Sequence, residues 1–113
     1  MQQIDVGLEW FLNPDHLPFI VALEKGWFRD LGLDVRLHEP EGHYDSLSAV
    51  IEGGLAFACN EPLHMVDAPR PGLKALGCFF ETDGGVMLTP EGQARLSAGE
   101  SIRIASPVAG EVT

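Results

Sequence analysis

Apolar and polar residues follow two different periods in the first third of the chain, and this pattern predicts a strand, a helix and a second strand. Residues 4–8 and 33–37 alternate apolar with polar side chains, which is typical of strands with one buried face. Between them the apolar density rises from His16. Gly26 interrupts this segment and Gly32 ends it, as expected of a largely buried helix with glycine stops.

The rest of the chain continues this alternation of strands and helices. Asp45 is a good N-cap for a helix over residues 46–52, which Gly53 and Gly54 end. Further elements are predicted as a strand at 55–58, a helix capped by Asn60 with Pro62 in its first turn, strands at 73–80 and 86–88 around a turn at 82–85, a short helix from 89–91, a strand from 101, and a helix start at 108–113. The pattern predicts an α/β domain with a small, mainly parallel sheet, flanking helices and right-handed crossovers.

Composition and charge exclude several classes of partner. The chain has 113 residues, 45% of them hydrophobic, enough for one small globular core. Its net charge of −10 argues against nucleic acid or an anionic membrane surface as a partner. No apolar run approaches the roughly 20 residues that span a bilayer, and no signal segment is recognisable at the N-terminus. We expect a periplasmic or cell-envelope location if a signal was removed, and a cytoplasmic one otherwise.

Candidate ligand-binding side chains cluster directly after the predicted strands. In open parallel sheets, ligands bind beyond the carboxyl ends of the strands. An indole can stack on a flat heterocycle, while amide and carboxylate groups bind its ring nitrogens and amino groups. This combination suits a small planar polar ligand. The candidates are Trp10, Asn13 and His16 after the first strand, Glu39, His43 and Tyr44 after the second, and Asn60, Glu61 and His64 after the third.

Each candidate also has a purely structural interpretation. Trp10 fits a core or hinge aromatic, Asn13 a turn residue before proline, and His16 an ordinary helix start. Asn60 fits an N-cap, and Glu61 complements a helix dipole. These alternatives stay open on the residues alone.

Two reactive-site interpretations are less favoured by the residues. The four histidines and two cysteines lack the close spacing of a structural zinc motif, so no metal site is expected. A nucleophilic pair of Cys59 and His64 lacks an identifiable partner to orient the base. The cysteines, Cys59 and Cys78, lie in or beside apolar runs and are expected to be buried free thiols.

The ordered set of segments resembles type II periplasmic binding proteins, in the nitrate, taurine and pyrimidine-precursor branch that includes the thiamine-pyrimidine synthases. The segments are LEWFLNPDH at 8–16, VALEKGWF at 21–28, LGLDV at 31–35, EP at 39–40, GGLAF at 53–57 and NEPLH at 60–64. The resemblance implies one lobe of a two-lobed fold, with residues 1–100 forming a first lobe and residues 101–113 a crossover strand and the start of an absent second lobe. It also implies that Trp10, Asn13 and His16 face the ligand.

One position departs from the synthases in a way that affects the chemistry. In those enzymes a reactive histidine matches His64, and a lysine four positions earlier holds pyridoxal phosphate. This chain has Asn60 there, and an amide cannot form a Schiff base with an aldehyde cofactor. Lys25 and Lys74 lie elsewhere, and the run of cysteines found in the synthases is lacking. The sequence therefore favours binding without a cofactor over catalysis.

These observations lead to one main functional hypothesis and two alternatives. The main hypothesis is a solute-binding protein, or its N-terminal lobe, which captures a small polar organic molecule such as a pyrimidine precursor or a sulfonate and delivers it to an ABC importer permease. The first alternative is an enzyme related to the thiamine-pyrimidine synthases, with His64 reactive. The second is a half-size domain that acts through self-association as a homodimer.

Overall fold

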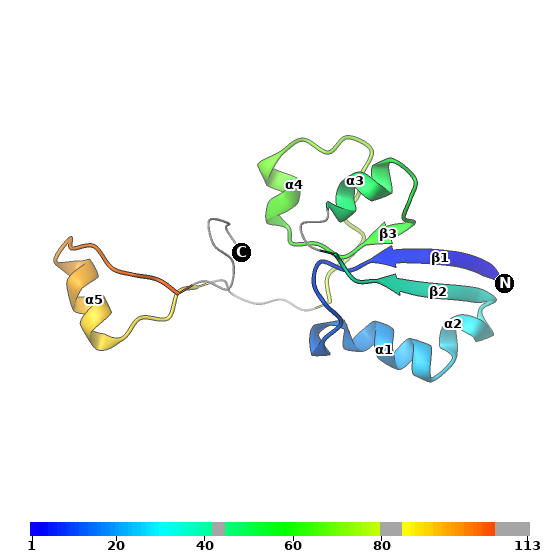
Figure 1. Cartoon of the computed structure of the whole chain (residues 1–113), viewed down its shortest axis with the longest axis horizontal. Coiled ribbons are helices and arrows are strands. Elements are labelled where there is room, and N and C mark those ends of the chain that lie inside the picture. Colours follow the sequence, from blue (N-terminus) through cyan, green and yellow to red (C-terminus); the bar gives the residue numbers. More distant parts are fainter. Residues whose placement is uncertain (42–44, 80–84, 106–113) are drawn as a thin grey trace. The chain divides into compact units, whose positions relative to one another are not determined.

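A parallel sheet with helices on both sides forms the first part of the protein. A computed structural model describes residues 1–41, 45–79 and 85–105, and the chain divides into two compact units, Met1–Phe79 and Phe80–Thr113. In the first unit, β1 pairs in parallel with a strand on each side, in the order β2-β1-β3 (Figure 1). The strands are β1 (Gln2–Gly7), β2 (Leu33–His38) and β3 (Phe57–Ala58). The predicted fold class is confirmed.

The helices of the first unit cover opposite faces of this sheet. The chain moves from β1 to β2 in one direction and from β2 to β3 in the other, so right-handed crossovers place the two connections on opposite faces. In Figure 1, α1 and α2 lie on one side of the sheet, and α3 and α4 on the other. The helical elements are η1 (Pro14–His16), α1 (Leu17–Glu24), α2 (Trp27–Asp30), α3 (Ser46–Ile51) and α4 (Leu63–Asp67). As predicted, Gly26 separates α1 from α2; its φ of 75° suits glycine.

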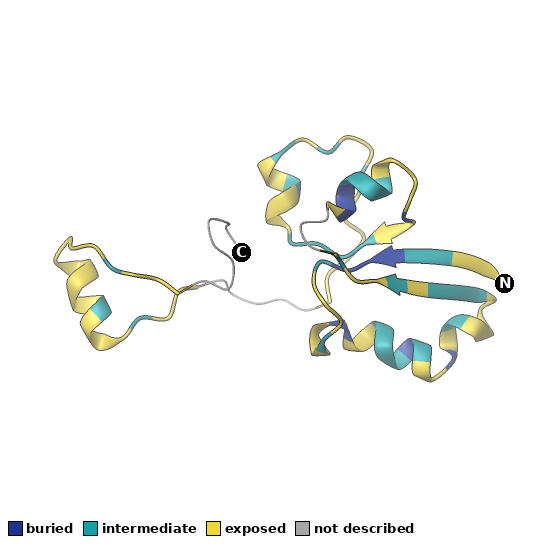
Figure 2. Ribbon diagram, viewed as in Figure 1, coloured by how far each residue is buried: buried dark blue, intermediate teal, exposed yellow. Residues whose placement is uncertain are grey.

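Side-chain alternation makes one face of the sheet apolar and the other polar. Ile4 and Val6 lie opposite Val35 and Leu37 of β2 in the strand register, whereas the intervening positions of both strands are mostly polar. Burial is greatest where β1 ends, with Val6 3% and Leu8 0% exposed, and Figure 2 shows the buried colour concentrated there. The core therefore supports the carboxyl end of β1.

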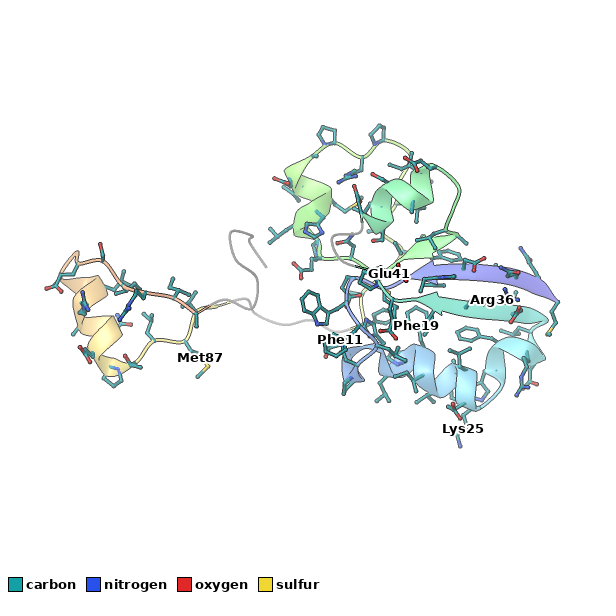
Figure 3. The ribbon with its side chains drawn as sticks, in the orientation of Figure 1. Phe11, Phe19, Lys25, Arg36, Glu41 and Met87 are labelled. Atoms are coloured by element: carbon teal, nitrogen blue, oxygen red, sulfur yellow. The ribbon has the colours of Figure 1, made fainter. Side chains whose placement is uncertain are left out.

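The second unit contains one described helix, α5 (Pro90–Ser97), as predicted from Thr89 and Pro90. The Thr89 hydroxyl accepts a hydrogen bond from the Gly92 amide at 3.1 Å and so caps the helix. Met87, which precedes α5, is 99% exposed, and its side chain projects from the ribbon in Figure 3.

Three predicted strands are wrong for the residues that the structure describes. Residues 73–79, 86–88 and 101–105 form no strand, and each segment exposes a large apolar side chain: Leu76 is 77%, Val86 59% and Ile104 59% exposed. An apolar run becomes a strand only where a neighbouring strand supplies hydrogen-bond partners, and β3, two residues long, offers little edge for pairing.

Some predictions remain untested by the described residues. Residues 82–84 of the predicted turn and the helix start at 108–113 lie outside them, and the boundary between residues 100 and 101 stays a prediction. None of the helices in the described part of the chain is long and apolar enough to cross a membrane.

Close packing at Gly7 leads to the first testable prediction. A Cβ atom at Gly7 would lie 2.6 Å from Leu55 Cδ1 and 3.4 Å from Ser46 Cβ, and both neighbours are buried. Gly7→Ala is expected to lower the free energy of unfolding by about 1–3 kcal/mol, because the core must shift to admit a methyl group. Gly54→Ala, whose Cβ would meet its nearest atom at 3.6 Å, is the control. Urea denaturation showing equal stability for both variants would contradict this packing.

The cap of α3 leads to a prediction about pH. Hydrogen bonds from the Ser48 hydroxyl, and then from Arg70, lower the pKa of Asp45 from 3.8 to about 2. A carboxyl whose pKa is lower in the folded state stabilises the fold above its unfolded pKa, and this contribution is lost as the pH falls toward the folded pKa.

Asp45→Asn should therefore destabilise the protein above about pH 4, by less than about 1 kcal/mol because Asp45 is 47% exposed. The difference from the wild type should shrink between about pH 4 and pH 2. Glu52→Gln, at the other end of α3, is the control. Chemical denaturation across this range measures the difference, and a constant difference would contradict the assigned bonds.

Candidate functional site

The loops after β1 and β3 meet at the carboxyl edge of the sheet. Gly7 and Ala58 are the last paired residues of β1 and β3, and the Cys59 amide donates to the Gly7 carbonyl at 2.8 Å. Glu9 lies two residues after the end of β1, and Asn60 lies two residues after the end of β3. Because the chain leaves β1 and approaches β3 on opposite faces, this is the position at which open α/β sheets bind ligands. We call residues 9–16 and 59–64 the carboxyl edge.

The first cluster on the carboxyl edge joins Glu9 to a buried histidine. His16 is 1% exposed, and its Nε2 lies 2.9 Å and 3.2 Å from the two carboxylate oxygens of Glu9. The Asn13 backbone amide donates to His16 Nδ1 at 3.2 Å. An amide N–H can only donate, so the neutral imidazole carries its proton on Nε2 and donates it to Glu9. His16 therefore fixes the direction of the Glu9 carboxylate.

Asn13 holds the turn that brings this histidine back to Glu9. Its side-chain amide donates to the Phe11 carbonyl at 2.7 Å, and its side-chain oxygen accepts from the Asp15 amide at 2.9 Å, capping η1. Both ring nitrogens of His16 and both ends of the Asn13 side chain thus have internal partners. Ligand contact by either residue stays a prediction.

Glu9 is a candidate that the sequence reasoning did not identify. Its side chain is 28% exposed, so the carboxylate combines a buried partner with access to solvent. The spacing of seven residues between Glu9 and His16 corresponds to no helix or strand period, because the intervening residues form an irregular loop. The sequence signal for Glu9 is a carboxylate directly after the predicted strand at residues 4–8, and most charged residues are simply exposed to solvent.

Trp10 lies at the surface beside this cluster. It is 47% exposed, and its ring centroid is 6.0 Å from that of Phe11 at an interplanar angle of 49°. The neighbouring Phe11 is 58% exposed and is labelled in Figure 3. The core interpretation of Trp10 does not fit this exposure, and the loop offers aromatic faces to solvent directly after β1.

The second cluster lies after β3 and contains Asn60, Ser46 and His64. The Asn60 side-chain amide donates to Ser46 Oγ at 3.2 Å, and its oxygen accepts from the Glu61 backbone amide at 2.8 Å. The same oxygen contacts His64 Nδ1. The prediction that Asn60 caps the third helix is wrong, because α4 begins two residues later than such a cap requires, with Pro62 at its N-cap. Its polar groups instead join α3 to the loop before α4.

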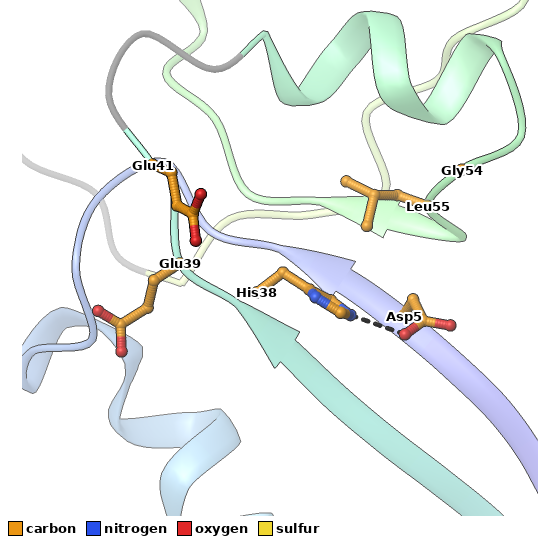
Figure 4. Close-up of a pocket in the computed structure, with 6 residues that line it drawn as sticks. All are labelled: Asp5, His38, Glu39, Glu41, Gly54 and Leu55. Carbon is orange, nitrogen blue, oxygen red and sulfur yellow. Dashed lines mark hydrogen bonds and ion pairs between the residues drawn. The ribbon is translucent and has the colours of Figure 1, made fainter.

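The remaining candidates are placed differently or lie outside the described residues. Glu61 is half-buried, and its backbone takes part in the second cluster. Glu39 is exposed and lines an open depression of about 500 Å³, in which Figure 4 shows its carboxylate directed away from His38. No hydrogen bond of the described residues joins Glu39 to either cluster. His43 and Tyr44 lie outside the described residues.

That depression also contains a side-chain hydrogen bond between β1 and β2. His38 Nε2 lies 2.7 Å from Asp5 Oδ1, and this hydrogen bond is the main reason why the pKa of Asp5 is lowered (Figure 4). In residues 1–41, 45–79 and 85–105, no three histidine, cysteine or acidic side chains are grouped so as to hold a metal ion.

The two cysteines are free, and Cys59 is unsuited to nucleophilic chemistry. Burial, and secondly the charge of Glu9, raises the pKa of the Cys59 thiol from 9.0 to about 11. A thiol is nucleophilic as its thiolate, which is scarce near neutral pH at this pKa. This argues against the pair with His64. Cys78 is exposed rather than buried, because its segment forms no strand.

Comparisons with known proteins show the family to which the sequence is similar. The sequence model of the NMT1/THI5-like family matches residues 13–82. The chain is 30% identical over 70% of its length to a 4-amino-5-hydroxymethyl-2-methylpyrimidine phosphate synthase of Uromyces fabae. It is 31% identical over 51% of its length to a formylaminopyrimidine-binding protein of Halalkalibacterium halodurans. It is 29% identical over 58% of its length to the synthase THI11 of Saccharomyces cerevisiae.

The chain spans only part of these relatives, 24% of the first, 18% of the second and 19% of the third. The resemblance to the pyrimidine-precursor branch of type II periplasmic binding proteins is confirmed, as a partial domain.

The proximity of Glu9 and Cys59 leads to a prediction about thiol reactivity. Iodoacetamide at mildly alkaline pH is expected to modify the exposed Cys78 before Cys59. Glu9→Gln should accelerate modification of Cys59 by up to about tenfold, which corresponds to one pKa unit, because a neutral side chain no longer disfavours the thiolate. Glu24→Gln in α1 is the control. Peptide mass spectrometry follows each thiol, and an unchanged Cys59 rate in Glu9→Gln would contradict the assigned proximity.

Proposed function

The chain belongs to the NMT1/THI5-like family, and from this membership we propose that it binds a small planar molecule of the pyrimidine-precursor type at the carboxyl edge. The carboxylate of Glu9 is the observation that carries the proposal. It lies two residues after β1, is held by the buried His16, and remains accessible beside the exposed Trp10. The site would bind its ligand without altering it.

The chemistry of the carboxyl edge fits a flat ligand with N–H groups. A carboxylate accepts hydrogen bonds from an exocyclic amino group or a ring N–H, and a charge-assisted bond is stronger than a neutral one. An exposed indole stacks on an aromatic ring. The net charge of −10 disfavours an anion such as a sulfonate. We therefore propose an amino-substituted heterocycle as the ligand, with His16 acting through Glu9.

The names of the relatives support both binding and catalysis, and Asn60 favours binding. One relative is named as a formylaminopyrimidine-binding protein and two as synthases. Asn60 carries an amide, not the amine that a Schiff base with an aldehyde requires. Its side chain is already bonded to Ser46 and to the Glu61 amide. The enzyme stays the second candidate, because His64 is exposed on the carboxyl edge.

The role of the whole protein is a further part of the proposal. If this lobe is part of a binding protein with two lobes, that protein would capture the ligand outside the cytoplasmic membrane and deliver it to an ABC importer permease. Self-association through the exposed side chains of this lobe is the alternative. A single lobe covers only part of a ligand, so weak binding is expected for this chain alone.

A titration with two small molecules tests the proposal. In heteronuclear NMR, 4-amino-5-hydroxymethyl-2-methylpyrimidine is expected to shift the Trp10 indole signal, and taurine is not. Glu9→Gln should weaken pyrimidine binding by about tenfold or more, because a neutral amide replaces the charged acceptor. Glu24→Gln, a matched change on α1, should leave the affinity unchanged. Equal affinity of the wild type and Glu9→Gln, or a preference for taurine, would contradict the proposal.

A further inference from the structure

Three polar side chains form a row that ends at the carboxyl edge. Ser46, the first residue of α3, is 1% exposed, and its hydroxyl accepts a hydrogen bond from the Asn60 side chain at 3.2 Å. Asn60 is half-buried and contacts His64 Nδ1 with its side-chain oxygen. His64 itself is exposed. The row therefore runs from the interior of the fold to the surface, and its last member is accessible to a ligand.

The orientation of the Asn60 amide is set by a group that can only donate. The Glu61 backbone N–H lies 2.8 Å from Asn60 Oδ1, so the atom facing it must be the oxygen and not the nitrogen. A serine hydroxyl either donates or accepts, and Ser46 can therefore receive the Asn60 NH₂ group on the other side. Both ends of the amide thus have complementary partners.

This orientation determines which nitrogen of His64 carries the proton. Nδ1 contacts the amide oxygen, an acceptor, and must donate to it. In the neutral imidazole, Nε2 then has a free lone pair. Among the described residues, no hydrogen-bond partner contacts His64 Nε2. An accessible acceptor is therefore left on the carboxyl edge.

The other histidine of the carboxyl edge has the opposite arrangement. A donor, the Asn13 amide, faces Nδ1 of His16, and a carboxylate faces its Nε2. His16 is buried and uses its proton to hold Glu9, whereas His64 is exposed and directs its proton inward to Asn60. The two residues therefore carry their protons on different ring nitrogens.

We propose that Ser46 and Asn60 are positioning residues that hold His64 with its proton on Nδ1, so that Nε2 accepts a hydrogen bond from an N–H group of the ligand. The ligand part of this inference rests on the proposed function, while the tautomer is independent of it. Together with the carboxylate of Glu9, His64 gives the carboxyl edge two acceptors. Such a site selects a ligand with two N–H donors, as an amino-substituted heterocycle has, and disfavours one that carries only acceptors.

The tautomer is measured without ligand by NMR of the whole chain labelled with ¹⁵N-histidine. The spectra are recorded at increasing alkaline pH until the ring ¹⁵N shifts no longer change, so that each imidazole is in its neutral form. Two-bond ¹H–¹⁵N correlations then show which ring nitrogen is protonated. The expected result is a proton on Nδ1 for His64 and on Nε2 for His16, which serves as the internal reference. A proton on Nε2 of His64 would overturn the proposal.

Variants test whether Asn60 and Ser46 cause this state. Asn60→Asp keeps an oxygen acceptor and should keep the proton on Nδ1, whereas Asn60→Leu should shift His64 to the Nε2–H form. Ser46→Ala should shift only part of the His64 population, because the Asn60 amide loses one anchor while the Glu61 N–H still faces its oxygen. Ser48→Ala changes the other bonded serine of α3, whose partners are Asp45 and Arg70, and should leave His64 unchanged. If Asn60→Leu does not fold, Asn60→Ala, which removes the same acceptor, carries the test. An unchanged His64 in a folded Asn60→Leu or Asn60→Ala would overturn the proposed positioning, and an unchanged His64 population in Ser46→Ala would overturn the part assigned to Ser46.

The ligand role is tested by titrating 4-amino-5-hydroxymethyl-2-methylpyrimidine into two His64 variants. His64→Phe removes the acceptor and should weaken binding by about two- to tenfold, the effect of one neutral hydrogen bond, whereas His64→Gln should retain most of the affinity. Equal affinity of the wild type and His64→Phe would overturn the role of His64 as an acceptor. In that case a loss of affinity in Glu9→Gln would still support the proposed function. No effect of either substitution would refute both.

Discussion

The parallel pairing of β1 with a strand on each side is the constraint on which the candidate site depends. It aligns the ends of β1 and β3, so the two loops that follow start from the same edge of the sheet. Gly7 and Leu55 allow this approach, since a side chain at position 7 would occupy the space of Leu55. Ser46, packed against the same position, brings the start of α3 to Asn60. Fold and site are thus coupled through a few tightly packed atoms.

The carboxyl edge uses its two histidines in opposite ways. Both imidazoles have one nitrogen fixed by a group whose hydrogen-bonding role is unambiguous, a backbone amide for His16 and an oriented side-chain oxygen for His64. The first imidazole is buried and supports a carboxylate; the second is exposed and offers a lone pair. In the proposed tautomers the two imidazoles therefore present different nitrogens, because the neighbouring backbone and side chains decide where each proton resides.

The sequence predicted much of the first unit because local signals and tertiary context agree there. The alternation in residues 33–37, the glycine at position 26 and the Asp45 cap each correspond to an observed feature. Prediction failed where an element needs a partner. Residues 86–88 have a suitable composition for a strand but, like the rest of the described second unit, no strand to pair with. Helix α4 starts later than predicted because the polar atoms of Asn60 bond to Ser46 and to its neighbours instead of capping the helix.

The candidate site was only partly predictable for a similar reason. The sequence identified the loops and several of their residues, since binding groups follow strand ends in this architecture. It did not pair Glu9 with His16, or Asn60 with Ser46, because these contacts depend on an irregular turn and on the packing of α3. The position of a bound ligand decides whether the carboxyl edge is the binding site.

Isotope-filtered nuclear Overhauser spectra of the chain with 4-amino-5-hydroxymethyl-2-methylpyrimidine would locate that ligand. Binding at the carboxyl edge predicts contacts from the pyrimidine methyl and methylene protons to the Trp10 indole and to the side chain of His64. Contacts confined to the depression lined by Asp5, His38 and Glu41 would contradict it.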